Sequence, residues 1–296
     1  MNKLIIRSKY IGLFLLKRVI YFLTGILDIF FMDKAKEKIK KLYFENVHGN
    51  SPDIEDKNSR HDGAKGHWLE KQLGKEPDGK NEADFWGYEC KNHTTSGKTT
   101  WGDWTPNYYI FDKDSGYDLS RDAFLMIFGK PNAEKDNRLS WSGEPAPRTP
   151  NKISNFGQYI VVDDELNINI YYDFSKDLRK QKSNIVPLKF QKDNLLLAKW
   201  YGYEKNNNSK KTALETKVKN KFNNKGWFKC VMENNIYTKI IFGKPISFET
   251  WIEYVKSGDV YFDSGMYQGN IRPYSQWRSD NIFWDNLVTE EFSIGI

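Results

Sequence analysis

The stretch from Asp84 to His93 constrains this 296-residue chain most, because it combines acidic, basic and aromatic residues at strand spacing. Glu89 and Lys91 are two residues apart, so on an extended strand their side chains point to the same face. Asp84 lies five residues before Glu89 and would face the opposite way on an unbroken strand. We therefore expect a bulge or kink at Gly87 that turns Asp84 back toward Glu89.

Two carboxylates that converge beside an amine are suited to the hydrolysis of phosphodiesters. Mg²⁺ binds carboxylate oxygens and fills its other positions with water and substrate phosphate. We expect Asp84 and Glu89 to hold Mg²⁺, and Lys91 to stabilise the attacking hydroxide or the charge that develops on the phosphate. The alternative is that Glu89 and Lys91 form a solvated pair on a surface strand.

A short helix is predicted before this stretch, from Gly66 to its stop at Gly74. Trp68 or Leu69, together with Leu73, would face the core. Glu70 lies at the centre of this helix and becomes a third carboxylate near the metal if the helix packs beside the strand.

These residues carry a resemblance to a known family. The pattern Gly-x-x-Leu-Glu-x-x-Leu, followed by Asp-x-x-x-x-Glu-x-Lys-x-His, resembles the PD-(D/E)xK nucleases. It is most similar to the MvaI/BcnI group of type II restriction endonucleases, whose relatives include MutH and LlaMI. The resemblance implies that Asp84, Glu89 and Lys91 form the catalytic triplet, that Glu70 is the helix carboxylate, and that His93 is the group's histidine. Ala83 replaces the Pro of the family motif.

The same resemblance implies an α/β (α+β) fold with a mixed sheet flanked by helices and a second, DNA-recognition lobe. We expect a catalytic lobe over residues 32–111. Residues 112–296 would form the recognition lobe and supply elements that complete the core.

Composition indicates a soluble, folded and cytoplasmic protein, with 28% charged residues, 16% aromatic residues and a mean hydropathy of -0.72. Cys90 and Cys230 are too few for a disulfide framework and lack metal-type spacing. The net charge is +6, but residues 1–31 hold five basic residues and one acidic residue, which leaves +2 for the remainder. Any affinity for DNA must therefore come from a local basic face.

The N-terminal segment is apolar from Tyr10 to Phe31, but Lys17 and Arg18 divide it into two runs. Each run is well short of the roughly 20 apolar residues that span a bilayer, so a membrane role is not favoured. We expect Met32 to be the true start and residues 1–31 to be an upstream extension. A helix on a membrane surface is the alternative.

The remaining patterns predict alternating strands and helices. The segment from Thr99 to Phe111 is expected to pair with the catalytic strand. Helices are predicted over 33–47, 209–221 and 248–255, and strands over 159–162, 166–172, 195–201, 227–232 and 236–242.

Residues 260–287 hold an unusual concentration of side chains that read bases, between two glycines and a proline. Arg reads guanine bidentately, and Asn or Gln reads adenine. The candidates for DNA contact are Asn270, Arg272, Tyr274, Gln276 and Arg278, with Arg138 and Arg148 from the basic region before them. Alternatively, Arg272 and Arg278 pair with Asp280 or Asp285 on the surface. The family's His-Asp-His-Gly element is missing, which leaves the target sequence open.

The sequence thus predicts a Mg²⁺-dependent type II restriction endonuclease that cleaves double-stranded DNA. Like its relatives, it would bind as a monomer, read a short C/G-rich pseudo-palindromic site such as CC-N-GG and cut one strand at a time. A cognate DNA methyltransferase would belong to the same system without direct contact. The alternatives are a MutH-like nicking enzyme of DNA repair, and a non-catalytic DNA-binding or membrane-associated protein.

Overall fold

The computed structural model describes residues 34–53, 64–76, 78–92, 97–150 and 152–293. The chain divides into two compact units. Unit 1 comprises Met1–Pro77 and Met232–Ile240, and unit 2 comprises Asp78–Val231 and Ile241–Ile296. The predicted N-terminal extension, residues 1–31, lies outside the described residues.

The described part of unit 1 contains two helices, both of which the sequence predicts. The first covers residues 34–46 and buries Ile39 and Tyr43, which recur at helical spacing. Helix α2 (Ala64–Gln72) buries Leu69, and Leu73 is buried just after its end. Gly74 follows with a φ of 84°, a left-handed conformation that suits a helix stop.

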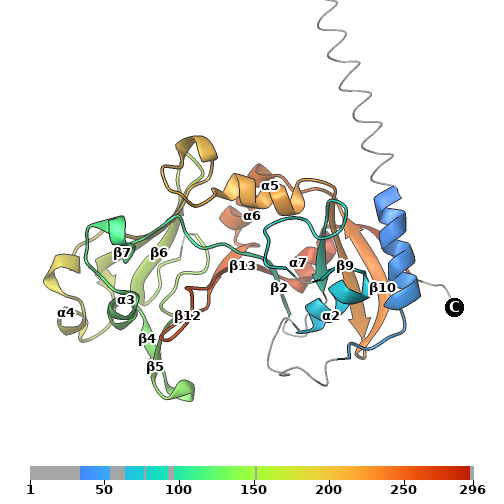
Figure 1. Cartoon of the computed structure of the whole chain (residues 1–296). Coiled ribbons are helices and arrows are strands. Elements are labelled where there is room, and N and C mark those ends of the chain that lie inside the picture. Colours follow the sequence, from blue (N-terminus) through green and yellow to red (C-terminus); the bar gives the residue numbers. More distant parts are fainter. Residues whose placement is uncertain (1–33, 54–63, 77, 93–96, 151, 294–296) are drawn as a thin grey trace, which may run out of the picture. The chain divides into compact units, whose positions relative to one another are not determined.

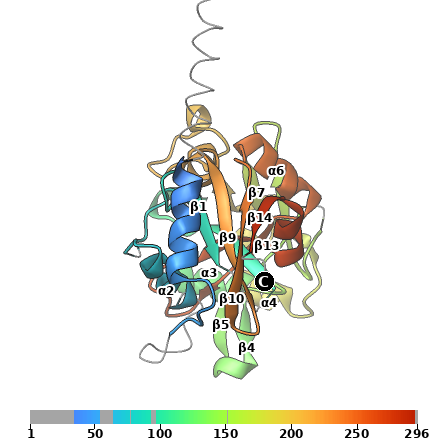
Figure 2. The same cartoon turned by 90° about the vertical axis from the view of Figure 1, so that its right-hand side faces the viewer.

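In unit 2, the predicted catalytic strand is β1 (Tyr88–Asn92), which lies at the edge of a four-stranded sheet. It runs parallel to β9 (Gly226–Glu233), and the two strands lie side by side in Figure 2. The strand order is β1-β9-β10-β14, where β10 is Ile236–Gly243 and β14 is Val288–Phe292. The tip of the β9–β10 hairpin belongs to unit 1. The strands predicted at 227–232 and 236–242 are confirmed.

The segment after the catalytic strand does not pair with it, so that prediction is wrong. Strand β2 (Lys98–Asp103) pairs antiparallel with β13 (Ser275–Asp280), which also pairs with β11 (Tyr261–Ser264). The physical reason is burial: this arrangement places Trp101 of β2 and Trp277 of β13 in the hydrophobic core. Both sheets combine strands from before and after residue 112. The division into a catalytic and a recognition lobe stays a prediction.

The other two sheets of unit 2 are antiparallel. One has the order β12-β5-β4 and the other β3-β8-β7-β6. The strand predicted from 166 begins instead at Ile168, because Leu166 has a φ of 58° and ends the preceding turn. These strands are β3 (Tyr108–Tyr109), β4 (Lys130–Asn132), β5 (Arg138–Trp141), β6 (Phe156–Val162), β7 (Ile168–Asp177), β8 (Leu195–Trp200) and β12 (Met266–Tyr267).

Helices and buried tryptophans contribute to the hydrophobic core of unit 2. Helices α5 and α6, both predicted, pack against each other and are drawn side by side in Figure 1. Eight of the ten tryptophans are buried in this unit's core cluster. The helices are α3 (Arg121–Phe128), α4 (Lys182–Ile185), α5 (Leu214–Phe222), α6 (Phe248–Ser257) and α7 (Asn281–Asn286).

The predicted mixed α+β class is therefore confirmed. Among the described helices, none is both long and apolar enough to cross a membrane.

Candidate active site

A two-residue turn brings Asp84 back toward Glu89. Phe85 and Tyr88 exchange both backbone hydrogen bonds, each 2.9 Å long, so the chain reverses direction between them. Trp86 and Gly87 form the turn with φ values of 48° and 93°. Positive φ at both positions is typical of the type I′ hairpin turn. The expected change of direction at Gly87 is thus present, as a full reversal rather than a bulge.

The reversal places Asp84 beside the start of β1. The Oδ2 atom of Asp84 accepts a hydrogen bond of 2.9 Å from the backbone N–H of Cys90. In a two-residue hairpin that closes on Phe85 and Tyr88, positions 84 and 89 are opposite each other and share one face. The two predicted carboxylates therefore start from neighbouring positions on the same side.

Glu89 is the centre of a buried charge cluster. Its side chain is almost inaccessible, with the residue 1% exposed, and Lys91 Nζ donates to Glu89 Oε1 over 2.8 Å. A second ammonium, Lys221 Nζ, donates to the same oxygen over 2.9 Å. Glu89 and Lys91 are therefore buried, and the alternative of a solvated pair on a surface strand is wrong.

Lys221 comes from α5 and was not among the predicted site residues. Helix α5 buries Leu214, Val218 and Phe222, and packs against β1. Lys221 precedes Phe222, so the same packing delivers its amine to Glu89. The sequence indicates a Lys-rich helix here, but no local signal connects it to a residue 132 positions away.

The surroundings of Lys91 lower its pKa from the ordinary value of a lysine. Burial lowers the pKa of Lys91, the charge of Glu89 acts to raise it, and the charge of Lys221 lowers it further. Asp84 is close enough to act on the same amine through its charge. Lys91 Nζ also lies 5.1 Å from the centre of the Phe222 ring. Both acidic groups and both amines therefore act on one small volume.

The donor set fits a divalent cation that shares its coordination with substrate. The second carboxylate oxygen of Glu89, Oε2, is buried and has no hydrogen-bond partner in the described part of the chain. An unpaired buried carboxylate oxygen is costly unless a cation or donor completes it. Within the described ranges, no group of three or more His, Cys, Asp or Glu side chains is arranged to hold a metal. Two carboxylates plus phosphate oxygens suffice for Mg²⁺.

Two further predicted catalytic residues stay predictions. Glu70 lies in α2, at the position expected in that helix, and it belongs to unit 1. His93 lies outside the described residues.

The structure gathers the two distant arginines onto the predicted recognition segment. Strand β5 pairs with β12, and the Arg138 guanidinium lies 3.5 Å from the centre of the Tyr267 ring. The Arg148 backbone carbonyl accepts from Phe262 over 2.8 Å, and its guanidinium lies 4.2 Å from the Tyr261 ring centre. Both arginines therefore contact tyrosines of the segment 260–287.

Arg278 and Gln276 face each other on β13. Arg278 Nη2 donates to Gln276 Oε1 over 2.5 Å, and Arg278 Nη1 lies 3.4 Å from Asp263 Oδ2. The Nε atom of Arg278 is buried and has no partner among the described residues. The alternative pairing of this arginine with Asp280 or Asp285 is not the one observed.

Asn270, Arg272 and Tyr274 differ in exposure. Asn270 is buried, its side-chain oxygen accepts from the Tyr267 backbone N–H, and its carbonyl accepts from Arg121. Arg272 is half-exposed, forms a 2.7 Å ion pair with Asp103, and lies over the ring of Tyr274. Asn270 therefore shapes the loop that presents Arg272.

Comparisons with known proteins agree with this geometry. The family model of the LlaMI restriction endonuclease matches residues 47–292. The type II restriction enzyme ScrFI of Lactococcus lactis subsp. cremoris is 48% identical over 269 residues, which cover 88% of this chain and 99% of ScrFI. The fold is similar to restriction endonuclease MvaI in a complex with its cognate DNA, with a TM-score of 0.53, 15% identity, and coverage of 90% of this chain and 98% of MvaI. The chain belongs to the LlaMI restriction endonuclease family, and so to the type II restriction enzymes.

Proposed function

We propose that this protein hydrolyses phosphodiester bonds of double-stranded DNA at a specific sequence, with Mg²⁺ as cofactor. The observation that carries the proposal is the reversal at Trp86 and Gly87, which sets Asp84 beside a buried Glu89 that keeps one carboxylate oxygen unpaired. Asp84 and Glu89 are the proposed metal ligands. Glu70 is proposed as a third carboxylate and His93 as a further catalytic group, on the resemblance alone.

The division of labour follows from the charges. A bound Mg²⁺ would polarise the phosphate and lower the pKa of a bound water. Lys91 is held by Glu89 with its amine buried, and a fixed positive charge in a poorly solvated place stabilises the negative charge that develops on the phosphate. Lys221 also donates to Glu89 Oε1 and helps to orient that carboxylate.

Recognition is proposed to use the surface formed by Arg138, Arg148, Gln276 and Arg278. Arg278 is the strongest candidate for reading a base, since its guanidinium is aligned by Gln276 and Asp263. Such alignment reduces the cost of ordering a long side chain before it meets guanine. Tyr274 and Asn270 would support this surface. The target is proposed to be short, C/G-rich and pseudo-palindromic, such as CC-N-GG.

We further propose that the enzyme is cytoplasmic, acts as a monomer on DNA, and has a cognate methyltransferase in the same system that it does not contact. The catalytic lobe would centre on residues 32–111 and the recognition lobe on 112–296.

One experiment separates this proposal from its alternatives. Purified protein is incubated with unmethylated plasmid and Mg²⁺, without any other protein, and the product ends are sequenced. Double-strand cuts at one repeated sequence support the proposal. Nicks that require an added partner would favour a MutH-like role, and intact plasmid that is nevertheless bound would favour a non-catalytic DNA-binding protein.

A further inference from the structure

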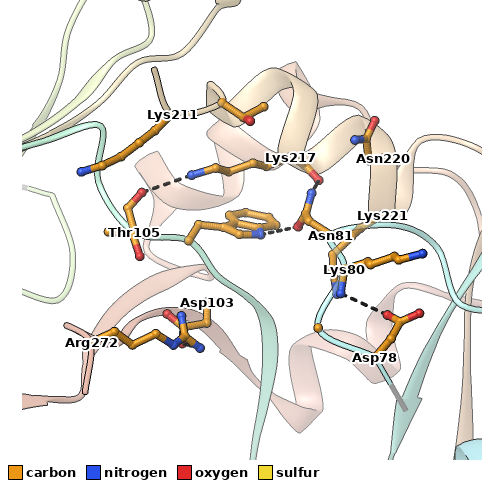
Figure 3. A pocket seen from close by; sticks show the side chains of 13 residues that line it. Asp78, Lys80, Asn81, Asp103, Thr105, Lys211, Lys217, Asn220, Lys221 and Arg272 are labelled. Atoms are coloured by element: carbon orange, nitrogen blue, oxygen red, sulfur yellow. Dashed lines mark hydrogen bonds and ion pairs between the residues drawn. The ribbon is translucent and has the colours of Figure 1, made fainter. Parts of the chain in front are cut away.

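A basic pocket of about 780 Å³ lies in unit 2, next to the candidate active site (Figure 3). Five cationic side chains line it: Lys80, Lys211, Lys217, Lys221 and Arg272. Two carboxylates, Asp78 and Asp103, also line it, so the formal excess is three positive charges. An excess of fixed positive charge in a concave site favours an anionic ligand.

Lys217 is a partly buried cation whose amine contacts a neutral oxygen. Its Nζ donates to the backbone carbonyl of Thr105 over 3.1 Å, and within the described ranges it forms no ion pair with a carboxylate. Burial, together with the nearby charge of Lys211, lowers the pKa of Lys217 to about 8, although Glu204 and Asp103 act to raise it. Lys211 likewise donates to a carbonyl, that of Pro106, over 3.0 Å, with Asp112 at 3.4 Å. Two neighbouring amines are thus held mainly by neutral oxygens.

The pocket is continuous with the candidate active site through α5. Lys217 and Lys221 are four residues apart on that helix, so they lie on the same face one turn apart. Lys221 both lines the pocket and contacts Glu89.

Two hydrogen bonds also fix the chain before Asp84 against α5. Asn81 Nδ2 donates to the Lys217 carbonyl over 3.0 Å, and the Ala83 N–H donates to the Asn220 carbonyl over 3.0 Å. The pocket and the carboxylates therefore hold a fixed spacing along one helix.

We propose that this pocket binds the phosphodiester next to the scissile one, on the strand that is cut. This inference rests on the proposed function, because a neighbouring phosphate is defined by the bond that the enzyme cleaves. Lys217 and Lys211 bind the anionic oxygens of that phosphate, and Lys221 lies between this phosphate and the cleavage site.

Arg272 then has a different role from the one that the sequence suggested. It lines the pocket and forms an ion pair with Asp103, which lines the pocket too (Figure 3). An arginine that contacts phosphate adds affinity on every sequence, whereas one that reads guanine adds it only on the target. In this role, Arg272 contacts the DNA backbone and does not specify a base.

Salt dependence of binding tests the proposal. The full-length protein and its variants Lys211→Ala, Lys217→Met and Arg272→Ala are titrated with a random-sequence duplex in EDTA, over a range of salt concentrations. Each variant is expected to lower the slope of log K against log salt by about 1, the change for one lost phosphate contact. Lys176→Ala, an exposed lysine that does not line the pocket, is the matched control and loses no slope from the pocket.

A second measurement locates the phosphate. Once sequencing has given the cut position, the phosphate next to it is replaced by a neutral methylphosphonate, and affinity for the target is measured. The replacement weakens binding to the wild-type protein and has little further effect on Lys217→Met. Additive losses would overturn the proposal, as would unchanged salt slopes in Lys211→Ala, whose exposed side chain makes misfolding a poor explanation. A wild-type protein that cuts no DNA would instead overturn the proposed function.

Discussion

Lys221 Nζ and Lys91 Nζ share one oxygen of Glu89, at 2.9 and 2.8 Å, although Lys221 lies 132 residues from Glu89 in sequence. Together with Asp84, these groups carry two positive and two negative formal charges, so the cluster is neutral. Both amines repel a divalent cation that enters this cluster, unless a phosphate binds with it and compensates the charge.

The affinity for metal without DNA should therefore rise when Lys221 is removed. We expect Lys221→Met to bind Mn²⁺ or Mg²⁺ at least tenfold more tightly than the wild type, because tenfold is about 1.4 kcal/mol and a unit charge a few ångströms away costs more than that at an effective dielectric constant of about 20. Calorimetric titration of the DNA-free protein measures this. Lys219→Met, on the exposed part of the same helix, is the control, and an equal gain there would contradict the account.

Removal of the shared carboxylate should destabilise the fold more than removal of one amine. Glu89→Gln removes the carboxylate that Lys91 and Lys221 share, which should cost about 3–5 kcal/mol of the free energy of unfolding. Lys91→Met leaves Glu89 paired with Lys221 and should cost much less. Urea unfolding of the two variants compares them, and equal losses would speak against a shared ion pair.

The turn before β1 should tolerate no side chain at Gly87. Its φ is 93°, and an added Cβ would lie 2.9 Å from Asn224 Nδ2. We expect Gly87→Ala to destabilise the protein by about 1–3 kcal/mol and to slow cleavage by moving Asp84. Gly116→Ala, at a φ of 78° with no atom within 4 Å of the new Cβ, should show the strain without the loss of cleavage. If Gly87→Ala and Gly116→Ala cleaved DNA at the same rate, Asp84 would have no part in the reaction.

Arg278 should set sequence preference. Its replacement by Ala is expected to reduce discrimination between the target and singly substituted sites by about 1–3 kcal/mol at one base position. Relative cleavage rates on a set of such sites give the value. A uniform loss on all sites would reassign Arg278 to the DNA backbone.

Lys217 should leave a signature in the pH dependence of stability. Its pKa in the folded protein is about 8, below the ordinary value, so the burial cost of its charge is fully present below that pH. Between about pH 8 and pH 10 the unfolded chain binds more protons than the folded protein, and stability should rise with pH. Lys217→Met should lack this contribution, as seen in the difference between the two unfolding free energies across the window. If the unfolding free energies of the wild type and Lys217→Met changed equally with pH across this window, the lowered pKa of Lys217 would be contradicted.

The sequence predicted the parts of the site that depend on local pattern. The spacing of Glu89 and Lys91 implied one shared face, and Gly87 implied a change of direction. The type of turn was hidden, because Asn-Gly is the usual type I′ signal and Trp86 rarely adopts a positive φ.

What the sequence missed depends on contacts between distant segments. Lys221 reaches Glu89 because Leu214, Val218 and Phe222 bury one face of α5, and no sequence period encodes which strand that face meets. The pairing of β2 with β13 likewise reflects the burial of Trp101 and Trp277, which a pattern read along the chain cannot assign to a partner.

Cleavage of supercoiled plasmid by wild type and Lys91→Met, in Mg²⁺ and with DNA affinity measured in parallel, tests the central claim most directly. The account predicts that the variant binds DNA within a few-fold of the wild type but cuts about 10²–10³-fold more slowly, or not at all. Cleavage by Lys91→Met at the wild-type rate would show that the cluster around Glu89 is not the catalytic centre.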